Sequence, residues 1–248
     1  MPVLSGQLAA PQSDSNAVIV DSNVWATWQS YVDVDYVNVT VGTPGARQEL
    51  MFQRADTAAA GYWTLDGVAQ VGNGSIMPLG PGSPDWRLAG IGDLTGTGMN
   101  DLVWQSKSTG GIGYWIVNGP ALVSTGTFSP SNSGSPGWRV VGLVDLNGDH
   151  SPDLIFQNVN TGDISYWLLN GTVKTSGGLF SPSNPGSSWS LVGAYHNYGT
   201  ATTTLYFQNT QTGNVQYWVM NSSQTMTSSG QLSPANNGSA SSLSMNYS

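Results

Sequence analysis

The chain contains no cysteine and very little charge. Of its 248 residues, 6 are Lys or Arg and 14 are Asp or Glu, so the formal net charge is −8. The absence of cysteine excludes disulfides, thiolate nucleophiles and cysteine-ligated zinc. The shortage of basic residues argues against nucleic acid and against anionic membrane surfaces, because both need clustered Lys and Arg. No apolar run is long enough for membrane insertion, and no signal peptide is visible at Met1.

Glycine and aromatic residues are abundant instead. The chain has 32 Gly, 10 Trp and 10 Tyr, while only 8% of its residues are charged. Short runs of β-branched and aromatic residues, such as 138–144, 153–157 and 163–169, each end in turn residues, which is typical of β-strands. The aromatic side chains can bury a substantial core, so we interpret the polar remainder as exposed sheet and turns rather than disorder. The sequence therefore predicts an all-β protein.

One four-strand pattern recurs four times along the chain. A Tyr-Trp pair begins at positions 62, 114, 166 and 217, so the spacing is almost constant. The same spacing relates four strands that end in glutamine, at Gln53, Gln105, Gln157 and Gln208. The repeats span about 34–85, 86–137, 138–188 and 189–240. Units of this length and content predict the four-stranded antiparallel blades of a β-propeller.

The two ends of the chain are expected to complete a fifth blade. The segment 242–248 is in register with the first strand of the fourth repeat, and the segment 1–33 contains candidate strands at 3–9, 17–21 and 24–31. We therefore predict a single domain, 1–248, that is a five-bladed β-propeller. Its last blade combines 1–33 with 241–248, which removes two open sheet edges. The alternative is a fragment of a larger ring that leaves those edges bare.

One loop, 145–153, has the residue types and spacing of a calcium site. Its oxygen ligands are the side chains of Asp145, Asn147, Asp149 and Asp153 at positions 1, 3, 5 and 9, with the Ser151 carbonyl at position 7. Calcium prefers several hard oxygen ligands, and three carboxylates offset its charge. One structural Ca²⁺ ion is therefore predicted. The alternative is an Asx-type turn whose side chains bind backbone N–H groups without a metal.

The corresponding loops of the other repeats have lost most of these ligands. The second repeat keeps Asp93 and Asp101 but has Thr95 and Thr97 between them, so it is a weak second site at best. The loops at 41–49 and 196–204 retain one carboxylate and none, and are expected to bind no ion. A single intact loop indicates that the metal, if bound, holds one corner of one blade.

The intact loop, the strand after it and the Tyr-Trp-Leu-Leu-Asn-Gly hairpin at 166–171 resemble FG-GAP (VCBS-type) repeats. Such repeats occur in the propellers of integrin α-subunits, in many exported bacterial proteins and in a group of propeller lectins. The resemblance covers about 34–248 and is weakest in the first repeat. It implies a β-propeller, loop-bound calcium, a secreted or cell-surface location and a binding role. The chain departs from the family because seven blades are usual there, and because three of its four metal loops are degraded.

Carbohydrate binding is the function that this pattern favours. Sugars stack their apolar C–H faces on aromatic rings and need polar partners for their hydroxyls. Trp86, Trp138 and Trp189 open three repeats beside polar loops such as 129–137 and 181–187, so they are candidate sugar contacts. The alternative is that these tryptophans pack between blades. The Tyr-Trp pairs are expected to pack there, one ring on each face of the sheet, because side chains alternate along a strand.

Catalysis has little support. The two histidines, His150 and His196, lie in metal-type loops, and Glu49 is the only glutamate, so no nucleophilic triad or carboxylate pair is evident. We therefore expect a non-enzymatic, lectin-like protein that binds glycans as a monomer or small homo-oligomer. The alternative is a protein-binding adhesin or scaffold whose partner is a surface protein, and its expected feature is an exposed apolar patch.

Overall fold

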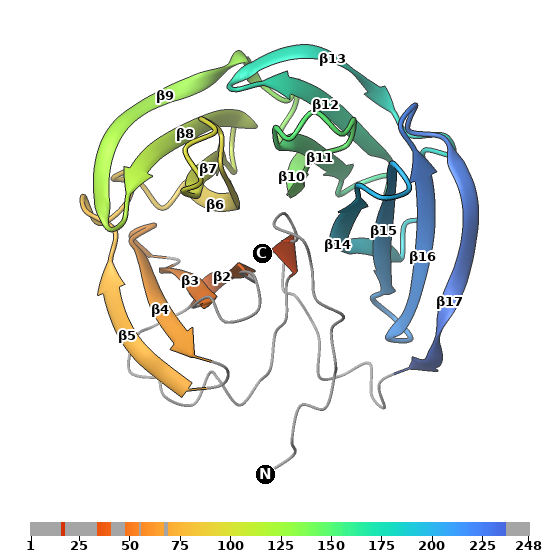
Figure 1. Cartoon of the computed structure of the whole chain (residues 1–248), viewed down its shortest axis with the longest axis horizontal. Coiled ribbons are helices and arrows are strands. Elements are labelled where there is room, and N and C mark those ends of the chain that lie inside the picture. Colours follow the sequence, from red (N-terminus) through yellow and green to blue (C-terminus); the bar gives the residue numbers. More distant parts are fainter. Residues whose placement is uncertain (1–15, 18–33, 41–47, 55, 67–68, 237–248) are drawn as a thin grey trace.

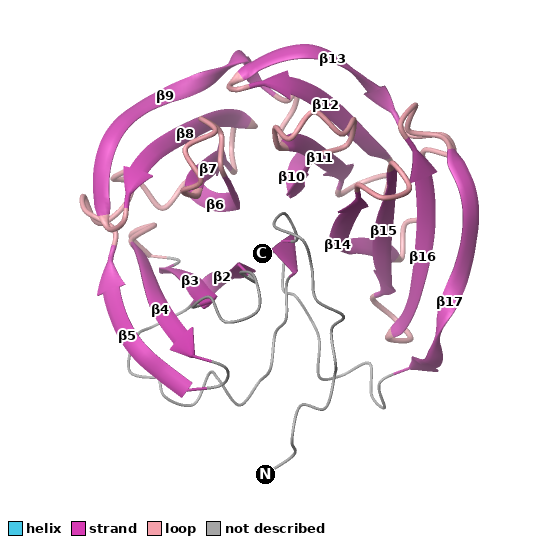
Figure 2. Ribbon diagram, in the orientation of Figure 1, coloured by secondary structure: helices cyan, strands magenta, loops and turns pink. Residues whose placement is uncertain are grey.

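The computed structural model describes residues 16–17, 34–40, 48–54, 56–66 and 69–236 (Figure 1). These residues form strands and loops, with no helix among them, so the predicted all-β class is confirmed (Figure 2). Accordingly, the described part of the chain offers no helix that is long and apolar enough to cross a membrane.

The strands form four consecutive antiparallel units, each paired in chain order. The first unit consists of β2 (Val34–Thr40), β3 (Gln48–Arg54), β4 (Ala60–Asp66) and β5 (Ala69–Ser75). The second unit consists of β6 (Trp86–Gly92), β7 (Asp101–Ser106), β8 (Gly111–Asn118) and β9 (Ala121–Asn132). The third unit consists of β10 (Trp138–Val144), β11 (Asp153–Asn158), β12 (Ile164–Asn170) and β13 (Val173–Leu179). The fourth unit consists of β14 (Trp189–Asn197), β15 (Thr202–Asn209), β16 (Asn214–Asn221) and β17 (Met226–Asn236). The first strand of each unit begins at a predicted repeat boundary.

The units are arranged around a common centre (Figure 1). The first strand of each unit lies innermost and the fourth lies at the rim. Composition is consistent with this order, because the second strand β11 is buried around its apolar centre Leu-Ile-Phe, whereas the rim strand β13 is largely polar and mostly exposed.

Three apolar cores fill the spaces between consecutive units. The core between the second and third units, for example, combines Val103 and Phe128 with Val140, Phe156 and Trp167. A second core joins the first and second units, and a third joins the third and fourth. Each unit therefore depends on its neighbours for burial of its faces, which is the energetic basis of a repeat protein.

The Tyr-Trp pairs supply rings to two cores at once. Trp167 packs into the core between the second and third units, while Tyr166 packs against the core between the third and fourth. Trp115 and Tyr114 divide in the same way. The prediction that each pair faces two neighbours is confirmed for these units, because adjacent side chains on a strand point to opposite faces.

A repeated glutamine connects three of the second strands, β3, β7 and β11, to the next unit. The Gln105 side chain donates from Nε2 to the Trp138 carbonyl at 2.8 Å and accepts from the Val140 N–H at 2.9 Å. Gln53 makes the same two bonds to Trp86 and Leu88, and Gln157 makes them to Trp189 and Leu191. These glutamines act as a side-chain substitute for strand pairing across the junctions.

The rim strands add a second connection between units. The Met77 N–H donates to the Pro120 carbonyl, and the Leu122 N–H donates back to the Met77 carbonyl. The Ser129 N–H donates to the Thr172 carbonyl, and Ser181 exchanges two bonds with Gln224 and Met226. The ends of β5, β9 and β13 therefore bind the hairpin turn of the next unit.

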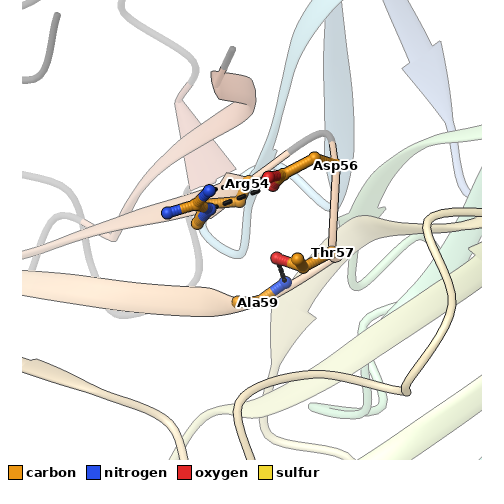
Figure 3. Close-up of polar contacts among 4 residues, drawn as sticks. All are labelled: Arg54, Asp56, Thr57 and Ala59. Carbon is orange, nitrogen blue, oxygen red and sulfur yellow. Dashed lines mark hydrogen bonds and ion pairs between the residues drawn. The ribbon is translucent and has the colours of Figure 1, made fainter. Parts of the chain in front are cut away.

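The turn between β3 and β4 differs from its counterparts, which carry glycine. Ala58 has a φ of +58°, whereas Gly110 and Gly162 hold the corresponding positions. Beside it, the Arg54 guanidinium makes a bidentate ion pair with Asp56 (Figure 3), with distances of 2.9 and 2.7 Å. This ion pair lowers the pKa of Asp56. The Ala59 N–H donates to the Thr57 hydroxyl in the same turn.

The predicted fifth unit falls mostly outside the described residues. This applies to 3–9, 24–31 and 241–248, and to 18–21 of the predicted strand 17–21. The exception is β1 (Asn16–Ala17), which pairs with β14 and with β2 and so joins the innermost strands of the fourth and first units. The sequence predicts Ala17 in a strand, 17–21, of the closing blade built from 1–33 and 241–248, whereas in the structure it pairs with the edges of β14 and β2, the inner strands of two other units.

Candidate functional site

The predicted calcium loop, 145–153, connects β10 to β11. The carboxylates at its two ends are buried, with 1% of Asp145 and 0% of Asp153 exposed. Asn147 and Ser151 are half-buried, and Asp149 is exposed. The structure therefore brings the five predicted ligands into one loop but divides them into a buried pair and a more accessible trio.

Asp145 organises the loop through backbone bonds. Its Oδ1 accepts from the N–H groups of Asn147, Gly148 and Asp149, and its Oδ2 accepts from His150 N–H at 2.7 Å. One side chain thus holds four consecutive backbone groups in a tight turn. This network matches the metal-free turn that is the alternative to a calcium site.

Asp153 connects the loop to the sheet. Its Oδ2 accepts from Leu146 N–H and its Oδ1 from Leu169 N–H, both at 2.8 Å. One buried carboxylate thus joins the start of the loop to β11 and β12.

The second unit repeats both arrangements. Asp93 accepts from the N–H groups of Thr95, Thr97 and Gly98, and Asp101 accepts from Leu94 and Val117. This loop has no carboxylate at positions 3 and 5, so the end carboxylates have a structural role that needs no ion. The residues that distinguish the third unit are therefore Asn147 and Asp149.

The donor set of the third unit fits calcium in charge and in type. Burial, with a smaller contribution from the Asp149 and Asp145 carboxylates, raises the pKa of Asp153 to about 7, although two backbone hydrogen bonds oppose the shift. A divalent cation would offset the negative charge of these three carboxylates. In the described part of the chain no three His, Asp or Glu side chains are gathered around one point, and Asp149 binds Ser151 N–H and the Asn147 amide instead. Calcium binding by this loop stays a prediction.

The raised pKa of Asp153 predicts a pH dependence in calcium-free buffer. A carboxyl whose pKa is higher in the folded than in the unfolded chain stabilises the fold at low pH, and that contribution is lost as the pH rises from about 4 to about 7. Between these pH values we expect the free energy of unfolding of wild type to fall by about 2–4 kcal/mol more than that of Asp153→Asn. Urea unfolding of both proteins at pH 4.5 and 8 measures the difference, and a pH-independent difference would contradict it.

The three candidate tryptophans lie at the junctions between units. Trp86, Trp138 and Trp189 are half-buried, and each packs against the core between its own unit and a neighbour. Their backbone carbonyls accept the glutamine bonds described above. This accounts for the repeated Trp by packing, and sugar contact by these rings stays a prediction.

Sequence reasoning missed a cluster of rings beside the loop 145–153. The His150 ring stacks on Tyr198, with centroids 4.8 Å apart and planes at 25°. The His196 ring meets the same Tyr198 edge-on at 4.6 Å. His150 belongs to the third unit, while His196 and Tyr198 belong to the fourth. No sequence signal identifies this cluster, because it joins position 6 of one loop to positions 1 and 3 of the next.

His196 is buried, with 3% exposed. Its Nδ1 lies 3.0 Å from the Thr203 hydroxyl. Its Nε2 is one of three buried side-chain polar atoms in the described residues without a hydrogen-bond partner. That nitrogen faces the loop 145–153, because a β-carbon on Gly148 would lie 3.8 Å from it.

Comparison with known proteins gives no family for this chain. No protein-family model matches it, and no curated protein matches it either.

Proposed function

We propose that the chain is a non-enzymatic, carbohydrate-binding β-propeller of five blades. The observation that carries the proposal is the repetition of one junction: each of three junctions has a half-buried Trp at the start of the inner strand. Polar loops rich in Ser, Asn and Gly lie next to these positions in the sequence. Repeated sites on one body raise avidity for clustered ligands even when each site is weak.

The proposed fifth blade is supported by the nearly constant sequence spacing between each glutamine and the two backbone groups that it binds. Gln53 and Gln105 each bind the first and third residues of the next unit's inner strand, and Gln157 does the same. Extending this register from Gln208 leads to positions 241 and 243. The proposal therefore assigns 241–248 the innermost strand of a closing blade, with 1–33 supplying the rest.

The proposed ligand class follows from surface chemistry. A chain with few charged groups and many hydroxyl and amide side chains suits neutral, hydroxyl-rich ligands better than phosphates or acidic polymers. The proposed calcium ion would be held by Asp145, Asn147, Asp149, Asp153 and the Ser151 carbonyl, and would supply charge neutralisation that stiffens this corner. The resemblance to exported repeat proteins supports an activity outside the cell or on its surface.

A glycan array tests the proposal. The intact chain, labelled at its N-terminus, is applied in calcium-containing buffer and again after chelation. We expect binding to a restricted set of neutral glycans, and a complete lack of binding in both conditions would overturn the carbohydrate proposal.

Protein binding is the second candidate function. It is favoured by exposed apolar side chains at the rim, where Val123 is 64% exposed, Met77 57% and Leu179 56%. Large exposed apolar groups are typical of protein-binding surfaces when they are contiguous. If the glycan array is negative, this rim becomes the surface to test.

A further inference from the structure

We propose that the stacked rings of His150 and Tyr198 form a platform for one neutral sugar ring, at the junction between the third and fourth units. The inference rests on the proposed carbohydrate-binding function and gives it a location. The platform is distinct from the three half-buried tryptophans, because it is built by loops rather than by inner strands.

The platform is assembled from two units and reaches the surface. His150 is exposed and Tyr198 is half-buried, so the stack extends outward from the junction. His196 supports Tyr198 from the side by an edge contact and is itself buried. A supported aromatic surface of this kind can contact the C–H face of a pyranose, which needs little more than one flat ring.

The turn at His150 does not need a ring. His150 has a φ of +67°, in the left-handed region. The corresponding residues are Gly98 in the second unit, with a φ of +78°, and Ala201 in the fourth unit, with a φ of +51°. The loop therefore forms with glycine or alanine at this position, and the exposed imidazole is a feature of the third unit alone among these three.

Polar residues lie next to the ring-bearing residues in the sequence and are candidates for hydroxyl recognition. Asp149 and Asn197 are exposed next to His150 and Tyr198 in sequence, and Asn147 is half-buried in the same loop. The buried Nε2 of His196, which lacks a partner, faces the loop near Gly148. A few polar groups beside an apolar surface are the usual composition of a small-ligand site. The carboxylates of the loop and the net charge of −8 disfavour acidic sugars.

The neighbouring junction has no equivalent platform. Between the second and third units, the corresponding positions hold Gly98 and Asn147, neither of which has a ring. The rings are therefore a local feature of one junction rather than a consequence of the repeat. We therefore expect one sugar site of this kind, with a specificity that the other junctions do not share.

The chain has two histidines, so its imidazole C–H NMR spectrum contains two sets of signals, which His150→Gly assigns. The probes are methyl glucoside, methyl galactoside, methyl mannoside and N-acetylglucosamine, with glucuronate as the acidic counterpart. We expect at least one neutral sugar to shift the His150 signals saturably, and glucuronate to leave them unchanged. Loss of an aromatic contact should weaken binding about three- to tenfold in His150→Gly and Tyr198→Ala.

One further variant keeps the test independent of stability. Ala201 occupies the position of His150 in the fourth unit and has a φ of +51°, so Ala201→Gly relieves similar strain without removing a ring. We expect Ala201→Gly to bind sugar as wild type does. If wild type binds glycans on the array but the His150 signals do not move and His150→Gly binds normally, the platform is wrong and the carbohydrate function stands. If wild type binds no glycan at all, the function fails and the platform fails with it.

Discussion

Gln105→Ala is expected to lower the free energy of unfolding by about 2–4 kcal/mol, because it leaves the buried Val140 N–H without a partner and removes one of the two hydrogen bonds that the Trp138 carbonyl accepts, the other coming from the Ser133 hydroxyl. Gln105 is 1% exposed, and its side chain binds the Trp138 carbonyl and the Val140 N–H of the next unit. Its Oε1 also accepts from the Arg87 guanidinium. Urea unfolding measures the loss, and Gln211→Ala, at an exposed turn position, is the matched control with an expected change within about 0.5 kcal/mol.

The same experiment on Gln208 tests the proposed fifth blade. Gln208 stands where Gln105 and Gln157 stand in their units, and its counterpart groups at 241 and 243 lie outside the described residues. If those residues form the innermost strand of a closing blade, Gln208→Ala should cost about as much as Gln105→Ala. A change as small as that of Gln211→Ala would overturn this closure.

Calcium at about 1 mM is expected to stabilise the chain by about 2.7 kcal/mol if the dissociation constant is about 10 µM, because a ligand at a hundred times its Kd contributes this amount. For a chain of this length, that corresponds to a rise of about 5–10 °C in melting temperature. Asp149→Ala should abolish the rise, since Asp149 is the carboxylate of the loop that has no counterpart in the second unit. Differential scanning calorimetry after chelation, and again after calcium addition, measures both.

Thr97→Ala is the matched control for this variant. Thr97 holds position 5 in the loop of the second unit, where Asp149 holds it in the third. Its response to calcium should equal that of wild type. If calcium raises the melting temperature of Asp149→Ala as much as that of wild type, the loop is the metal-free turn, stabilised by its backbone bonds to Asp145 and Asp153 alone.

Much of the fold could be predicted because the repeat is visible in the spacing and type of residues close together in the sequence. The regular spacing of the Tyr-Trp pairs located the units, and alternation along the third strand placed Trp167 and Tyr166 in different cores. Both signals depend only on spacing and side-chain type. The glutamines at Gln53, Gln105 and Gln157 are landmarks of the repeat, but their partners lie in the next unit, so their role could not be inferred from spacing.

The candidate site was only partly accessible to sequence reasoning. The loop 145–153 and its oxygen-bearing residues were identified, because their spacing is local. Asp145 and Asp153 hold the loop through backbone hydrogen bonds, and their counterparts in the second unit do the same, whereas Asn147 and Asp149 have no carboxylate or amide counterpart there. Only the hydrogen bonds of both units could separate these two roles.

By itself, the sequence determined the strands, the four repeats and the position of one acidic loop, since each of these follows from residue type and short-range spacing. The tertiary structure decided which loops meet across a junction. His150 and Tyr198 belong to different units, and only the packing of one unit against the next brings their rings to 4.8 Å. Contacts of this kind depend on the angle and distance between neighbouring sheets, which no local pattern specifies.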